Sequence, residues 1–169
     1  VIENGTDITI DLNGYTLTGA SNKYAIQFGS FDANGESDFE ECTYENDGEL
    51  IIENGEIDCY SAVLNYFGDV TFADDLTINA ENRIITTYGG EVTVDGAEMT
   101  TDGYGIVAFN SFHAYFTPEQ NSNANTNVKE NVSPTVTIEN GSIDAGTCVF
   151  SGNNLLSAGT EMIINGGEL

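Results

Sequence analysis

One short segment of alternating polar and apolar residues recurs six times along this 169-residue chain. The copies occupy positions 7–11, 49–53, 69–73, 91–95, 135–139 and 161–165. The central apolar residue moves by 20 positions from Ile52 to Phe72 and by 22 from Phe72 to Val94. The longer intervals, 42 from Ile10 to Ile52 and 44 from Val94 to Ile138, are close to two such periods. A period of about 21 residues is typical of a solenoid, in which each copy stacks on the next.

Two further apolar runs follow each copy. Most copies are followed by Asn-Gly or Asp-Gly, which tolerate positive φ and turn a chain sharply. The next run is marked by Leu17, Ile57, Ile78, Met99 and Ile143. The last is an aliphatic-x-aromatic triplet at 26–28, 64–66, 86–88, 107–109 and 148–150, with Thr86 as the exception to the aliphatic rule. Three runs per period predict three strands per coil.

The repeat therefore predicts an all-β fold, a right-handed parallel β-helix (solenoid) of about six coils of ~21 residues. We expect three strands per coil and two long loop insertions, at about 29–48 and 110–134, in a single domain over residues 1–169. The repeat pattern is unfinished at both ends. Because solenoids need polar caps, we expect a piece of a longer chain or a unit that stacks on others.

The charge of the chain excludes one class of partner. Twenty-eight acidic residues face three basic ones, for a formal net charge of −25. Nucleic acid binding requires Lys and Arg to neutralise phosphates, so we expect no nucleic acid partner. No apolar run reaches the length of a membrane-spanning helix, so we also expect no membrane insertion.

The repeat places many of the acidic residues in register. If alternate residues of each strand face inward, the remainder form outward columns. One column contains Asp7, Glu49, Asp69 and Glu91, and a second contains Asp11, Glu53 and Asp95. Stacked like charges repel, so the columns predict either Ca²⁺ sites or a solvated acidic face. Both interpretations stay open, and no cofactor is required.

The two insertions carry the aromatic residues that could bind a ligand. The candidates are Phe31, Phe39, Tyr44, Phe112, Tyr115 and Phe116. Both insertions leave the repeat just after an aromatic triplet, so they should emerge from one edge. Aromatic rings beside amides and carboxylates suit a glycan or a surface protein, and the alternative is that these rings pack back onto the fold.

The sequence offers few combinations of residues that could carry out catalysis. His113 is the only histidine and has no matching nucleophile, so we expect no enzyme activity. Paired carboxylates for glycoside hydrolysis remain open, since carboxylates are abundant. Three cysteines are present, and a Cys42–Cys59 bridge is left open.

Residues 8–19 and 162–169 resemble the pectin-lyase-like right-handed parallel β-helix superfamily, of the kind repeated in large bacterial surface and secreted proteins. The resemblance implies an extracellular or cell-surface location. Enzymes of that superfamily use a basic residue with calcium, or clustered aspartates with His, Arg and Lys, and neither set can be placed around Arg83.

We therefore expect a non-catalytic extracellular structural or adhesive module, a rigid spine that binds a glycan or protein partner at the insertions. One alternative is a filament or virion-fibre subunit that assembles end to end. A further alternative is a polysaccharide-active enzyme.

Overall fold

Ten strands and no helix make up the part of the chain that the computed structural model describes, residues 1–29, 47–109, 134–152 and 160–169. The strands are β1 (Ile8–Asp11), β2 (Thr16–Thr18), β3 (Tyr24–Phe28), β4 (Glu49–Glu53), β5 (Gly55–Asn65), β6 (Asp69–Phe72), β7 (Leu76–Thr87), β8 (Glu91–Phe109), β9 (Thr135–Gly152) and β10 (Glu161–Ile164). Among these residues no segment forms a helix long and apolar enough to cross a membrane.

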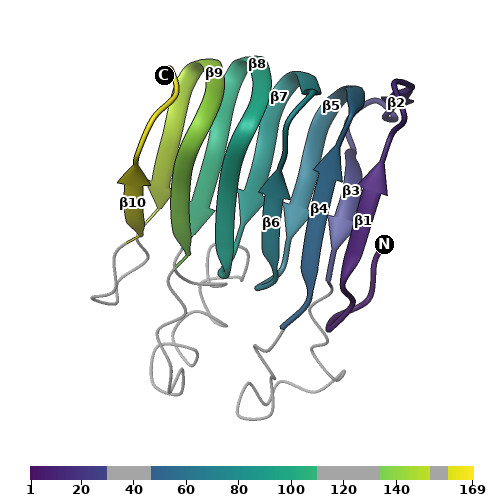
Figure 1. The fold of residues 1–169 in the computed structure, drawn as a ribbon, viewed down its shortest axis with the longest axis horizontal. Coiled ribbons are helices and arrows are strands. Elements are labelled where there is room, and N and C mark those ends of the chain that lie inside the picture. The colour runs from purple at the N-terminus through teal and green to yellow at the C-terminus, as the bar shows by residue number, and fades with distance from the viewer. Residues whose placement is uncertain (30–46, 110–133, 153–159) are drawn as a thin grey trace, which may run out of the picture.

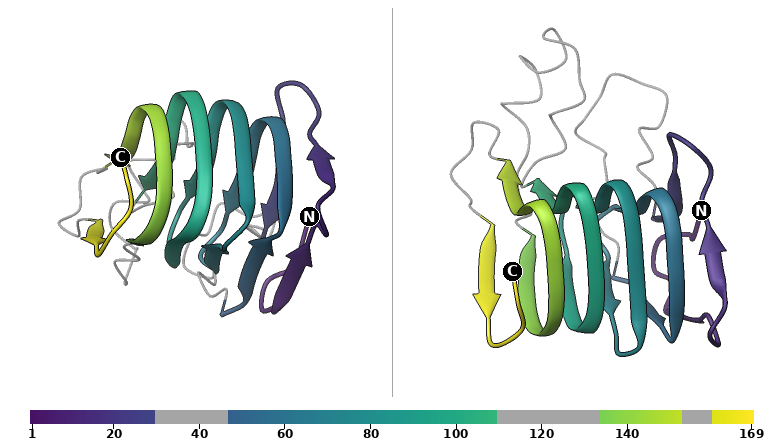
Figure 2. Two further views of the ribbon diagram at one scale, coloured as in Figure 1. Left: turned by 45° about the horizontal axis from the view of Figure 1, so that its top comes forward. Right: turned by 90° about the horizontal axis from the view of Figure 1, so that it is seen from above.

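All ten strands belong to one parallel sheet (Figure 1). Its main path is β1-β4-β6-β8-β7-β5-β2, while β3 pairs with β5, and β9 joins β8 to β10. The long strands bend over and return on the other side of the molecule, so the sheet is strongly curved (Figure 2). The sheet is continuous because β8 pairs with β6 through its first residues and with β7 through the rest.

The predicted fold class is wrong. The structure is a single parallel sheet, curved like half of a barrel, and not a right-handed β-helix of six coils with three separate strands in each. The physical reason lies at the predicted turns. Gly96 and Gly141 fall inside β8 and β9, which run unbroken for 19 and 18 residues. A bulge bends a strand without ending its pairing, so these positions change the strand direction but do not divide the sheet.

For the inward-facing residues of the first two runs, the register between neighbouring strands is the one that the sequence repeat predicts. Ile10 is paired with Ile52, Ile52 with Phe72, and Val94 with Ile138. The second apolar run also aligns, through Leu17, Ile57, Ile78, Met99 and Ile143. The all-β, parallel character of the described part of the chain is therefore established.

Two inward-facing columns on the first run form much of the core. Across the four middle strands their members have no exposed surface: Leu50, Ile52, Val70, Phe72, Val92, Val94, Val136 and Ile138. Full burial of such a side chain contributes about 1.5–3 kcal/mol. The residues between them, such as Ile51 and Thr71, are half-buried instead of fully buried, which agrees with the predicted alternation.

A column of residues with positive φ marks the bend after the first run. It comprises Asn13, Asn54, Asp75, Gly96, Gly141 and Gly167. Asn and Asp adopt this conformation more readily than other non-glycine residues. This preference explains why the repeated Asn-Gly and Asp-Gly pairs correctly located the bend.

The aromatic triplets stack, though less regularly than predicted. The rings of Tyr66 and Tyr88 are 5.4 Å apart, and those of Tyr88 and Phe109 are 5.6 Å apart, with nearly parallel planes. At the ends the predicted alignment fails. Gln27, not Ile26, is paired with Leu64, and Phe150 is paired with Val107. The register of β9 shifts by one residue between Thr101 and Tyr104, whereas the predicted alignment of the triplets would have needed a shift of three.

Candidate functional site

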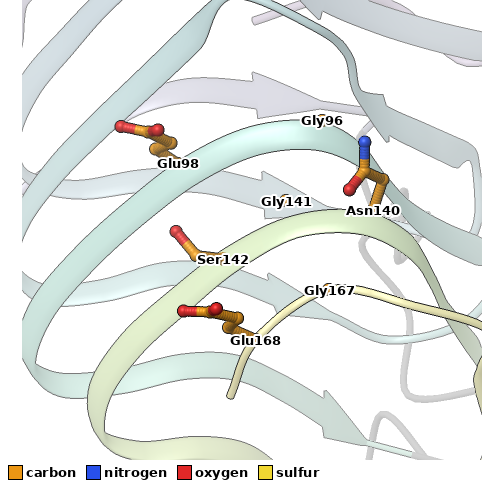
Figure 3. Close-up of a pocket in the computed structure, with 7 residues that line it drawn as sticks. All are labelled: Gly96, Glu98, Asn140, Gly141, Ser142, Gly167 and Glu168. Carbon is orange, nitrogen blue, oxygen red and sulfur yellow. The ribbon is translucent and has the colours of Figure 1, made fainter.

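An open-sided cavity of about 580 Å³ lies where the curved sheet bends, near the C-terminal edge (Figure 3). Its lining residues are Gly96, Glu98, Asn140, Gly141, Ser142, Gly167 and Glu168. Three of them are the positive-φ glycines of the bend. Because glycine has no side chain, this part of the bend is hollowed.

The polar groups of the cavity come from successive passes of the chain. Glu98 is paired with Ser142, which in turn bridges to Glu168. In Figure 3 these three side chains point to the same side, so a hydroxyl group separates two carboxylates. The arrangement can accept hydrogen bonds from a polar ligand.

The same cavity suits glycoside hydrolysis poorly. That reaction needs one protonated and one ionised carboxyl group, a difference that an apolar wall usually creates. Here both glutamates are exposed, and the lining consists of glycines and polar residues, with no apolar side chain.

The first predicted acidic column exists, and its carboxylates accept hydrogen bonds from residues of neighbouring strands. Asp7 is close to Glu49 and accepts a hydrogen bond from the Glu49 backbone N–H at 3.1 Å. Asp69 accepts the Glu91 N–H in the same way at 2.8 Å. The Glu91 carboxylate accepts from the Thr137 hydroxyl at 2.9 Å. These carboxylates therefore hold the beginnings of successive strands together.

The second predicted column is interrupted. Asp11 and Glu53 are paired, but a bulge leaves Asp95 opposite Asn140. Asparagine amides also approach the acids here: the Asn54 amide donates to Asp11 at 2.9 Å, a contact that relieves repulsion along the column.

Within the described ranges, no group of three or more His, Cys, Asp or Glu side chains is arranged to hold a metal ion. Calcium binding by the columns, which include the predicted ligands Asp7, Asp11, Glu49, Glu53, Asp69, Glu91 and Asp95, stays a prediction.

The predicted aromatic ligand-binding residues lie outside the described residues. They are Phe31, Phe39 and Tyr44 in the first insertion and Phe112, Tyr115 and Phe116 in the second. His113 and Cys42 lie in the same two segments.

Sequence reasoning missed a cluster around Arg83. Its guanidinium donates to the Tyr24 hydroxyl at 3.4 Å and to the Thr86 hydroxyl at 3.5 Å, and it lies 6.0 Å from the centre of the Tyr104 ring. Part of the signal was available, because the sequence repeat aligns Ser61, Arg83 and Tyr104. Tyr24 joins their column only through the one-residue displacement at β3. The cluster ties β3, β7 and β8 together.

Two cysteines lie among the described residues as free thiols, Cys59 and Cys148. Burial, with smaller contributions from the charges of Asp58 and Glu81, raises the pKa of Cys59 to about 11. A thiol with so high a pKa is a poor nucleophile at neutral pH.

The two edges of the sheet expose the residues that form its core elsewhere. Ile8 on β1 is 37% exposed, and Met162 and Ile164 on β10 are 49% and 52% exposed. They occupy the columns that are fully buried in the middle strands. Each of these two strands is paired on one side only among the described strands, so no further described strand covers the core at either edge.

Comparison with protein-family models, curated proteins and solved structures finds no match to this chain.

Proposed function

We propose that this chain is a non-catalytic structural module, a rigid β-spine within a surface or secreted assembly. The observation that carries the proposal is the continuous apolar core, with eight residues of the first run fully buried from β4 to β9. Away from the edges of the sheet, most apolar residues of the described strands are buried in the core, and the charged residues with identified hydrogen bonds connect strands.

The outward polar residues support the same role. The carboxylates of Asp7 and Asp69 and the amides of Asn54 and Asn165 all make cross-strand hydrogen bonds. A catalytic site would instead need groups directed at a substrate and held in unusual protonation states. The strongly acidic surface fits a soluble, extracellular setting in which self-repulsion opposes aggregation.

A turnover assay tests this proposal against the enzyme alternative. The protein would be incubated with neutral and acidic polysaccharides while reducing ends and unsaturated products are measured. We expect no product above the rate of the heat-denatured protein. Product formation that Glu98→Gln or Glu168→Gln abolishes, with the matched exposed-site variant Asp58→Asn unaffected, would refute the structural role and place catalysis in the cavity.

A second measurement addresses rigidity. Backbone amides of β4, β6 and β8 should exchange with deuterium only through global unfolding, because their strands are paired on both sides. Exchange through local opening of these strands would contradict a rigid spine.

A further inference from the structure

We propose that copies of this chain associate head to tail, with β10 of one copy pairing in parallel with β1 of the next. This inference rests on the proposed structural role and names the partner, a second copy of the chain. The reason is that the two open edges are complementary in hydrogen bonding, in apolar packing and in the order of polar groups.

Backbone geometry gives the register of the junction. The N–H groups of Glu161 and Asn165 donate inward to β9, so the backbone groups of Met162 and Ile164 point to the free edge. On β1 the Leu12 N–H donates inward to Glu53, so Thr9 and Asp11 point to the opposite free edge. The pairing of Met162 with Ile8 of the next copy thus follows the pattern by which β6 joins β4.

The apolar columns continue across this junction. Met162 and Ile164 continue the columns of Ile8 and Ile10. Next to the Ser142–Glu168 bridge, Leu169 is 54% exposed and takes the position that Ile143 has in the preceding pass. The corresponding residue in the next copy is Leu17. Half-exposed aliphatic residues at one end therefore meet aliphatic residues at the other.

The strongest observation is the order of polar groups at the bend. Hydroxyl groups and carboxylates alternate along one outward column of paired residues: Thr16, Glu56, Thr77, Glu98, Ser142 and Glu168. Thr16 donates to Glu56 at 3.0 Å within one copy. In the proposed junction Glu168 precedes Thr16 of the next copy, so the alternation continues and places a hydroxyl donor beside a carboxylate.

Charge repulsion opposes association and makes it sensitive to salt, because each copy carries a net charge of −25 and one contact of the junction adds to the repulsion. The junction brings Glu161 beside Asp7 of the next copy, whereas Asn165 comes beside Asp11 and adds no second charge. Exposed like charges about 5 Å apart are largely screened only when the Debye length falls below that separation, at several hundred millimolar salt. Because the two edges differ, the contact is heterologous. Because the junction repeats the pairing that joins β4 to β6, successive copies continue the stack in one direction and form an open-ended filament.

The test is sedimentation velocity and electron microscopy of the purified chain over a range of concentrations in 20 and 500 mM NaCl. We expect end-to-end species whose association constant rises about tenfold at the higher salt concentration. Met162→Glu blocks one edge and Ile8→Glu blocks the other, so each variant alone should be monomeric. An equimolar mixture of the two should form dimers and nothing larger, because each chain keeps one intact edge.

Two further variants serve as controls. Ile163→Glu adds the same charge to β10 on its outward side, and it should still form filaments. Ile164→Pro removes a free-edge N–H without changing the net charge, and it should abolish association even if glutamate proves tolerated. Circular dichroism confirms that each variant is folded.

The outcomes separate this inference from the proposed function. A wild-type chain that stays monomeric at every concentration and salt, or a singly blocked variant that still dimerises alone, would overturn the head-to-tail contact. Neither result changes the turnover assay or the exchange of the middle strands, which alone decide the structural role.

Discussion

Replacement of Gly141 by alanine should destabilise the fold much more than the same change at Gly14. Both glycines lie at the bend with positive φ, 99° for Gly141 and 76° for Gly14. A Cβ on Gly141 would overlap the carbonyl oxygen of Ala97, whereas a Cβ on Gly14 would have no atom within 4 Å. The comparison thus separates backbone strain, present in both variants, from a collision with the neighbouring strand.

The magnitudes follow from these two contributions. A non-glycine residue in the left-handed region costs about 1–2 kcal/mol, which is the whole effect expected for Gly14→Ala. Overlap with backbone that cannot rotate away adds about 1–3 kcal/mol. Gly141→Ala should therefore lose about 2–5 kcal/mol in the free energy of unfolding.

Urea unfolding followed by circular dichroism measures both losses, with equal m-values as the sign that the unfolding transition is unchanged. The reasoning would be refuted if the two variants lost the same stability, because the stacking of successive bends would then impose no steric demand. A larger loss for Gly14→Ala would have the same consequence.

Three other perturbations test other parts of the structure. Cys59, whose pKa is raised to about 11, binds its proton more tightly in the folded state, so stability should fall as pH rises from about 9 to 11. Cys59→Ala should show a smaller fall, and Cys148 should react with a thiol reagent before Cys59 does. Asn65→Ala should lower the free energy of unfolding, measured in urea, by about 2 kcal/mol, because the fully buried Asn65 amide donates to the Gly68 carbonyl at 2.6 Å. An unchanged urea midpoint would show that this bond does not contribute to stability. Asp69→Asn should change the free energy of unfolding by no more than about 0.5 kcal/mol, because an amide oxygen can still accept the Glu91 N–H. Asp69→Ala should lower it by about 1 kcal/mol. Equal losses by the two variants would contradict the role of Asp69 as a hydrogen-bond acceptor.

Hydrophobic periodicity predicted which residues stack, but not how the strands end. Alternation in each copy identified the inward residues, and the repeat fixed their partners, as the pairing of Ile52 with Phe72 shows. The fold class required a further fact, whether each bend divides one strand from the next. That depends on backbone pairing at Gly96 and Gly141, where a single residue decides between a turn and a bulge, and the pattern of side chains carries no such information.

The cavity at the bend was missed because its members differ in residue type. Glu98, Ser142 and Glu168 do not look like a repeat when the chain is read for similarity. Their shared property is position, since Glu98 and Ser142 each directly precede an apolar residue of the second run, and Glu168 precedes Leu169. Alignment by that position would have revealed the alternation of hydroxyl groups and carboxylates. The bulge that displaces Glu139 from Asp95 had no comparable signal.

The acidic columns show how like charges can be stacked in a stable sheet. Two exposed unit charges about 5 Å apart repel by only about 0.8 kcal/mol in water, and a charge-assisted hydrogen bond contributes about 1.5–3 kcal/mol. The bond from the Glu91 N–H to Asp69 can therefore offset the repulsion between these neighbours. The bond from the Glu49 N–H to Asp7 does the same at the first edge. Where a carboxylate accepts a backbone N–H, as Asp7 and Asp69 do, the stacking of acidic residues therefore requires no bound cation. Any calcium that binds there would have to compete with those bonds.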